Sequence, residues 1–138
     1  MQGLIPLHRV SAAAACAALI LLVVFQLVGL PSVRADAAPD PALATPEKTW
    51  NRYLEALRAG NRSIAIGCLT STARDKFQPI IEQSSTEQLR GMADAVRSFA
   101  LTGTTFGNMA EAAVSMKSGL GGLVYFVNMN GEWRINEM

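Results

Sequence analysis

Apolar and polar positions change their period close to residue 98, and this change divides residues 45–138 into two parts. Between residues 45 and 97 the apolar side chains recur at helical spacing, whereas residues 99–138 fall into short runs with strand character. Helices that are followed by a meander of about four antiparallel strands predict an α+β domain. We therefore expect N-terminal helices packed on one face of a curved antiparallel sheet.

The first helix is expected between Thr45 and Gly60. Thr45 is a favourable N-cap, Pro46 suits the first helical position, and Gly60 suits the position after the helix end. The spacing i, i+3, i+4 and i+7 gives this helix one apolar stripe, formed by Trp50, Tyr53, Leu54 and Leu57.

Three shorter helical segments follow. One is expected over residues 63–69 and another from Ser71, where Pro79 predicts a kink or a restart because proline removes a backbone donor. The sequence Ser85 to Gln88 has the form of a capping box and predicts the start of the last helix.

Strands are expected over residues 99–106, 109–117, 123–129 and 132–138. The Asn130-Gly131 pair between the last two predicts a two-residue hairpin turn, which fixes the register. This register places Phe126 opposite Ile135 and Val124 opposite Glu137. One face of the hairpin then carries the side chains expected in the core, namely Val124, Phe126, Trp133 and Ile135.

The N-terminal region predicts export of the domain. Residues 10–30 are uncharged and mostly apolar, a short basic stretch precedes them, and Val33-Arg34-Ala35 suits signal peptidase. We expect a cleaved signal peptide over residues 1–35, and the alternative is an uncleaved inner-membrane anchor over residues 10–30 with the domain outside. The product would be periplasmic, in the cell envelope or secreted. Residues 36–44 are rich in proline and alanine, which predicts a tether before a single domain at 45–138.

Composition excludes several kinds of site from the predicted mature chain. His8 is the only histidine and lies in the signal, so Ser-His-Asp and Cys-His arrangements are excluded. Cys68 is the only cysteine after the signal, so no internal disulfide and no usual zinc site can form, and no metal or cofactor is expected. Without Arg9 and Arg34 ten basic residues face eleven acidic ones, and no basic cluster predicts a nucleic-acid partner.

Two passages resemble the nuclear transport factor 2-like (cystatin-like cone) superfamily, particularly its short exported bacterial members of unknown function. They read TPEKTWNRYLEALRAGNRSIAIGCLTSTARDKF at 45–77 and VYFVNMNGEWRINEM at 124–138. The resemblance implies a cone-shaped sheet around a cavity beside the long first helix. Better-known members have a strand pair after the second helix, where this chain has a helical segment with Pro79.

The same resemblance implies two classes of function. Some members are isomerases or dehydratases that use an inward Asp, Tyr or His, and many only bind a ligand or a partner. This sequence offers no catalytic constellation, so we predict a non-enzymatic domain that binds a small apolar ligand, a protein partner or a second copy. The alternative is an isomerase- or dehydratase-like enzyme that uses Tyr53 or an inward carboxylate such as Glu137. The candidate pocket residues are Trp50, Tyr53, Phe77, Phe126, Trp133 and Glu137.

Two further alternatives stay open. Ala110 and Ala112 face inward opposite large side chains, which predicts either a lined cavity or a closely packed core. The outer face of the hairpin predicts a homodimer contact through Tyr125, Val127, Arg134 and Asn136, and scattered surface apolar residues are the alternative.

Overall fold

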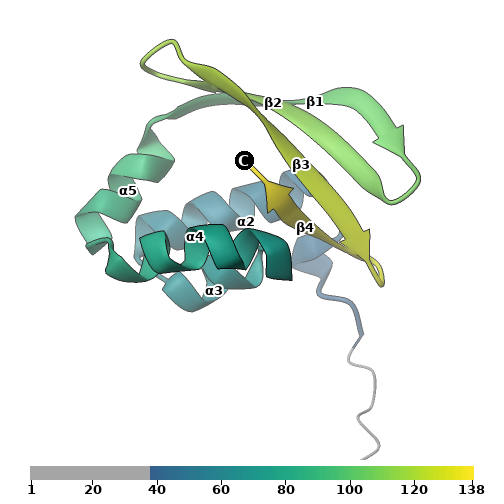
Figure 1. Ribbon diagram of the computed structural model, residues 1–138, viewed down its shortest axis with the longest axis horizontal. Helices are drawn as coiled ribbons and strands as arrows, with labels where there is room; N and C mark the ends of the chain where they lie inside the picture. The colour runs from purple at the N-terminus through teal and green to yellow at the C-terminus, as the bar shows by residue number, and fades with distance from the viewer. Residues whose placement is uncertain (1–37) are drawn as a thin grey trace, which may run out of the picture. The chain divides into compact units, whose positions relative to one another are not determined.

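The computed structural model describes residues 38–138, and at residues 104–106 the backbone alone. The described part is a four-stranded antiparallel sheet in the order β1-β2-β3-β4 with helices on one of its faces (Figure 1). This architecture confirms the predicted α+β class. The elements are η1 (Pro41–Leu43), α2 (Pro46–Ala59), α3 (Arg62–Gly67), α4 (Ser71–Gln83), α5 (Thr86–Asp94), β1 (Val96–Phe106), β2 (Met109–Met116), β3 (Gly121–Met129) and β4 (Glu132–Glu137).

The predicted signal peptide or membrane anchor over residues 1–35 lies outside the described residues. Within residues 38–138, none of the helices has the length and apolar character needed to cross a bilayer.

Helix α2 has the predicted bounds and the predicted buried face. The Thr45 hydroxyl accepts a hydrogen bond from the Lys48 N–H at 3.2 Å, which caps the first turn. Gly60 ends the helix with φ 69°, a left-handed conformation that favours glycine. The residues of the apolar stripe are all buried, as the spacing predicted: Trp50, Tyr53, Leu54 and Leu57.

Helix α4 corrects one expectation, because it continues through Pro79 to Gln83 without a restart. Proline removes the backbone hydrogen bond to the carbonyl of Asp75, four residues earlier. Both residues are exposed, so water can replace the missing bond and the helix is tolerated. Helix α5 starts as predicted, with a complete capping box between Ser85 and Gln88 at 2.7 and 3.2 Å.

The hairpin of β3 and β4 has the predicted turn and most of the predicted register. Asn130 and Gly131 both have positive φ, and Phe126 lies opposite Ile135. A register shift between Tyr125 and Phe126 then places Glu137 opposite Tyr125 instead of Val124, which corrects the predicted pairing at the strand end. The predicted core face is confirmed at Val124, Phe126 and Ile135, which are buried, while Trp133 is partly buried against the core.

Strand β4 is bound on both of its edges. Beside β3 on one edge, the segment Cys68–Thr70 runs along the other as a short parallel bridge. The Ile135 N–H donates to the Cys68 carbonyl at 2.9 Å, and the Thr70 N–H donates to the Ile135 carbonyl at 2.8 Å. The sheet therefore curves from β1 and β2 down to a last strand that lies beside the helices (Figure 1).

The described part of the expected tether is folded, which corrects its boundary. The Asp40 side chain accepts from the Ala42 N–H at 2.9 Å and caps η1, and Leu43 is buried in the core. The Asp40 N–H also donates to the Glu132 carboxylate at 2.9 Å. Because Leu43 is buried and Asp40 has a partner in β4, residues 40–44 of the expected tether pack on the domain.

Candidate functional site

An apolar pocket of about 340 Å³ lies between the helices and the sheet, at the corner where α5 leads into β1. Figure 1 marks the C-terminus just beyond the end of β4. Almost all of the pocket surface is apolar, and its lining side chains carry no charge. They are Trp50, Tyr53, Leu54, Leu57, Phe77, Met92, Ala95, Val96, Met116 and Met138.

Helix α2 supplies one wall of the pocket through its apolar stripe. Helix α4 adds Phe77 and helix α5 adds Met92, so three helices meet at this corner. The Lys117 N–H donates to the Ala95 carbonyl at 2.8 Å, which joins the end of β2 to the α5–β1 junction. This bond holds the junction beside Met116 and fixes the sheet side of the pocket.

Aromatic rings make the α2 wall stiff. The Trp50 ring stacks on Phe99 with centroids 5.5 Å apart, and lies 5.8 Å from the Tyr53 ring. Phe99 in turn meets Phe126 edge-to-face at 6.0 Å. Such pairs add attraction beyond burial and restrict the ring orientations. The wall is therefore largely formed before any ligand arrives.

Two polar atoms of this wall have no partner within residues 38–138. The Trp50 Nε1 is fully enclosed and donates to no acceptor, and the Tyr53 hydroxyl makes no hydrogen bond. An unsatisfied buried polar group costs about 1–3 kcal/mol. Burial, followed by the electrostatic effect of Cys68, raises the pKa of Tyr53 to about 12. Tyr53 therefore keeps its proton at neutral pH and is a donor.

The structure brings three of the six predicted pocket residues together, namely Trp50, Tyr53 and Phe77. Phe126 is fully buried behind Phe99 and does not reach the pocket. The Trp133 carbonyl accepts from the Thr49 hydroxyl at 2.7 Å, in the part of β4 that lies on α2.

Glu137 is also outside the pocket. Its carboxylate forms an ion pair with the Lys76 ammonium at 3.1 Å, and both side chains are 55% exposed. It is a solvated charge at a strand end, not an inward carboxylate.

The alanines of β2 are buried and do not line this pocket. Ala110 is opposite Phe126 and Ala112 is opposite Val124, and all four side chains are buried. The pocket lies elsewhere, nearer the end of β2. Three lining residues that were not among the six candidates could be predicted to face inward from the periodicity. Leu54 and Leu57 belong to the α2 stripe, and Met116 belongs to the inner face of β2. Met92 and Val96 also follow a helical spacing, whereas the place of Met138 beside them had no sequence signal.

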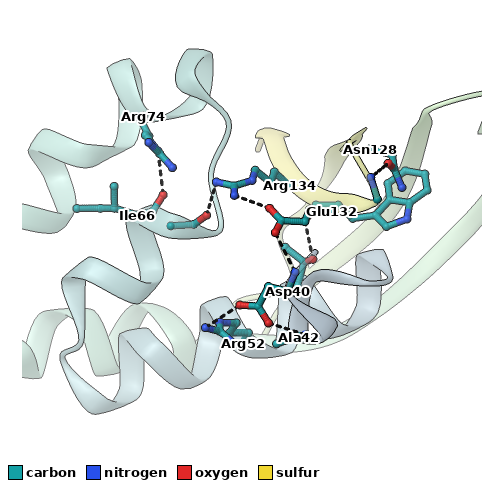
Figure 2. A network of polar contacts seen from close by, with 12 residues as sticks. Asp40, Ala42, Arg52, Ile66, Arg74, Asn128, Glu132 and Arg134 are labelled. Atoms are coloured by element: carbon teal, nitrogen blue, oxygen red, sulfur yellow. Dashed lines mark hydrogen bonds and ion pairs between the residues drawn. The ribbon is translucent and has the colours of Figure 1, made fainter. Parts of the chain in front are cut away.

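A polar cluster lies where η1, α2 and β4 meet (Figure 2). We call Asp40, Arg52, Glu132 and Arg134 the polar clamp. The Arg134 guanidinium donates to Glu132 at 2.6 Å and to the Gly67 carbonyl at 3.0 Å, and Arg52 pairs with Asp40 at 3.2 Å. The Asp40 N–H and then Arg134 hold the pKa of Glu132 below its usual range. These groups satisfy one another and join η1, α2 and β4.

The residues predicted for a homodimer contact differ in their environment. Arg134 belongs to the polar clamp, and the Asn136 side chain accepts from the Thr70 hydroxyl at 3.0 Å. Tyr125 and Val127 are half-buried on the sheet face that carries no helix. Three apolar side chains around them are exposed by 43% or more: Met109, Leu123 and Met129.

Neither a metal ligand set nor a reactive thiol is present in the described part of the chain. No three His, Cys, Asp or Glu residues lie close enough there to hold an ion. Cys68 is buried, and burial is the main cause that raises its thiol pKa to about 11. It behaves as a small apolar core residue.

Comparison with known proteins leaves the family unassigned. No protein-family profile matches the chain, and no curated protein matches it. Among solved structures, the chain is similar to the solution structure of a SEC-C motif containing protein from Rhodopseudomonas palustris. The TM-score is 0.40 and the identity 13%, over 69% of this chain and 77% of that chain. A likeness of this size carries no argument about function, so the resemblance to the nuclear transport factor 2-like superfamily stays a prediction.

Proposed function

We propose that this domain binds a small apolar ligand in the pocket between α2 and the sheet, in the cell envelope or outside the cell. The observation that carries the proposal is the pocket itself, with a volume of about 340 Å³ and an apolar lining from five elements and the residues beside them. Ligand sites in proteins have this character and begin at about 300 Å³. The stacked wall of Trp50, Tyr53 and Phe99 supports it, because a largely formed wall lowers the entropy cost of binding.

The lining favours binding over the alternative of an isomerase or dehydratase. Proton transfer beside an apolar cavity needs an acid or base of suitable pKa within reach of the substrate. Among the lining side chains Tyr53 carries the acidic hydroxyl, and its pKa of about 12 makes it a weak acid at neutral pH. Glu137, the other candidate, pairs with Lys76 at the surface.

The proposal is tested by filling the pocket. An environment-sensitive apolar dye is titrated into the full chain and into Ala95→Trp, which places a bulky ring in the lining. We expect saturable dye binding to the unchanged chain and at least a tenfold loss with Ala95→Trp. The matched control is Ala113→Trp, at an exposed position on the outer sheet face, which keeps the affinity. Equal affinity in both variants, or no saturable binding to the unchanged chain, contradicts the proposal.

Self-association through the outer sheet face is a second candidate role. It is favoured by the exposed side chains of Met109, Leu123 and Met129 around Tyr125 and Val127, since clustered apolar surface often marks a contact. Native mass spectrometry of the protein purified from its host reports the subunit count and any retained ligand together. A dimer that Leu123→Lys converts to a monomer supports this role, and a monomer at every concentration contradicts it.

A further inference from the structure

The Tyr53 hydroxyl is the polar group that the pocket offers to a ligand. It makes no hydrogen bond within residues 38–138, and Tyr53 is part of the lining. The other unpartnered donor, Trp50 Nε1, is fully enclosed, so a ligand meets the indole ring without reaching its nitrogen. The Tyr53 oxygen is not enclosed in this way, and Tyr53 is a lining residue of the pocket. A bound molecule can therefore gain one hydrogen bond from the Tyr53 hydroxyl.

The Tyr53 ring is held in place, which makes its hydroxyl a directional group. Its side chain is 4% exposed and its ring lies against Trp50, which itself stacks on Phe99. The hydroxyl cannot swing to a partner elsewhere without disturbing this packing. An acceptor on a molecule in the pocket would satisfy it.

The charge of the lining limits what the ligand can be. No lining side chain is cationic, so a carboxylate group drawn into the pocket would lose water without gaining a counter-ion. A neutral acceptor, such as a ketone or ester carbonyl, loses much less on desolvation and recovers one hydrogen bond. Because its raised pKa keeps Tyr53 protonated at neutral pH, the phenol donates and the ligand accepts.

The shape of the lining favours a flexible aliphatic chain. Three methionines, Met92, Met116 and Met138, come from α5, β2 and the residue after β4. Methionine side chains are unbranched and adapt to irregular partners. A volume of about 340 Å³ lies at the small end of ligand sites, which suits a short chain better than a fused ring system.

From these observations we propose that the pocket selects a neutral aliphatic carbonyl compound, with the carbonyl oxygen accepting from the Tyr53 hydroxyl and the chain lying against the methionines. This inference rests on the proposed function and adds the chemical class of the ligand to it.

The test compares three probes of equal chain length: a methyl alkyl ketone, the matching alkane and the matching carboxylate at neutral pH. Each displaces the apolar dye from the full chain, and its dissociation constant is measured. We expect the ketone to bind about three- to tenfold more tightly than the alkane, as one added hydrogen bond allows. The carboxylate binds at least tenfold more weakly than the ketone.

Two variants test whether the Tyr53 hydroxyl causes the preference for the ketone over the alkane. Tyr53→Phe removes the hydroxyl, so the ketone falls to the affinity of the alkane while alkane binding is unchanged. Tyr125→Phe is the matched control, since Tyr125 is half-buried on the outer sheet face and keeps the preference. The proposal is overturned if ketone and alkane bind the unchanged chain equally, which is the result expected when water already satisfies the phenol. Retention of the preference in Tyr53→Phe also overturns it.

The outcomes separate this inference from the proposed function. If dye and all three probes fail to bind, the pocket is not a ligand site and the proposed function fails. If the alkane binds as tightly as the ketone, or the carboxylate binds most tightly, the pocket is a ligand site and only the ligand class is wrong. The comparison of probes on the unchanged chain decides this even if Tyr53→Phe does not fold.

Discussion

Helix α2 contributes to two regions that are organised in opposite ways. Through Thr49 and Arg52 it joins β4 and the polar clamp, where each charged group has a partner. Through Trp50 and Tyr53 it forms the wall of the pocket, where two polar atoms have no partner among the described residues. The first region holds the last strand in place, and the second leaves space and one free donor. We infer that the contacts of the polar clamp offset the folding stability that is lost through the unsatisfied polar groups of the pocket wall.

Truncation of one large side chain in each region gives the largest expected contrast. Ile135 is fully buried in β4, so Ile135→Ala should lower the free energy of unfolding by about 2–5 kcal/mol. Phe77 is half-buried on the pocket wall, so Phe77→Ala should cost about 1 kcal/mol because it loses less buried area. Urea unfolding followed by circular dichroism measures both. Equal costs would mean that the pocket wall is as tightly packed as the clamp side.

Loss of the central guanidinium is expected to have a smaller effect. Arg134→Gln leaves Glu132 and the Gly67 carbonyl without their donor and should cost about 1–2 kcal/mol. Lys76→Gln is the control, because its ion pair with Glu137 is exposed and worth less than about 1 kcal/mol. The same unfolding measurement ranks the two. If Arg134→Gln costs no more than Lys76→Gln, the clamp is an ordinary surface ion pair.

The dependence of the unfolding free energy on acid pH is a further test of the polar clamp. The Asp40 N–H and Arg134 lower the pKa of Glu132 in the folded state, so this group adds stability above the usual glutamate pKa. That contribution is lost as the pH falls through the lowered value. We expect Glu132→Gln to flatten this part of the curve of unfolding free energy against pH, and Arg134→Gln to make it shallower. A Glu132→Gln curve parallel to that of the unchanged chain would show that Glu132 is not stabilised in the fold.

The alkaline response concerns the pocket and has no effect at neutral pH. Burial raises the pKa of Tyr53 from 10.0 to about 12, so the neutral phenol is favoured in the folded state. Its contribution is full below pH 10.0 and is lost as the pH rises through about 12. An absorbance titration should show tyrosinate forming in a step near pH 12, and Tyr53→Phe should remove that step while the titration of Tyr125, whose pKa is also raised by its hydrogen bond with Glu111, remains. A Tyr53 that ionises near 10.0 would mean that the wall is open to water.

Local signals predicted the elements well. The α2 stripe, the capping box at Ser85 and the Asn130-Gly131 turn depend on neighbours within a few positions, and the structure confirms each. At Pro79 the alternative of a restart was wrong, because a proline at an exposed position removes a bond that water replaces.

Features set by tertiary packing were not predictable in this way. The register shift after Phe126 and the bridge from Leu69 to Ile135 depend on segments far apart in the chain. Half of the candidate site followed from the α2 stripe and Phe77. The curvature of the sheet decided the rest, because it buries Phe126 and brings Met116 to the pocket.

The hydrogen bond from the Asp40 N–H to Glu132 also bears on how the domain assembles. The two residues are 92 positions apart, and Leu43 is buried at the same junction. Closing so long a loop is costly in chain entropy and is repaid only when β4 docks. A partial chain that ends before β4 would leave Leu43 and the inner face of β3 uncovered. Folding is therefore expected to be slow and all-or-none, with the first and last described segments meeting in its final step.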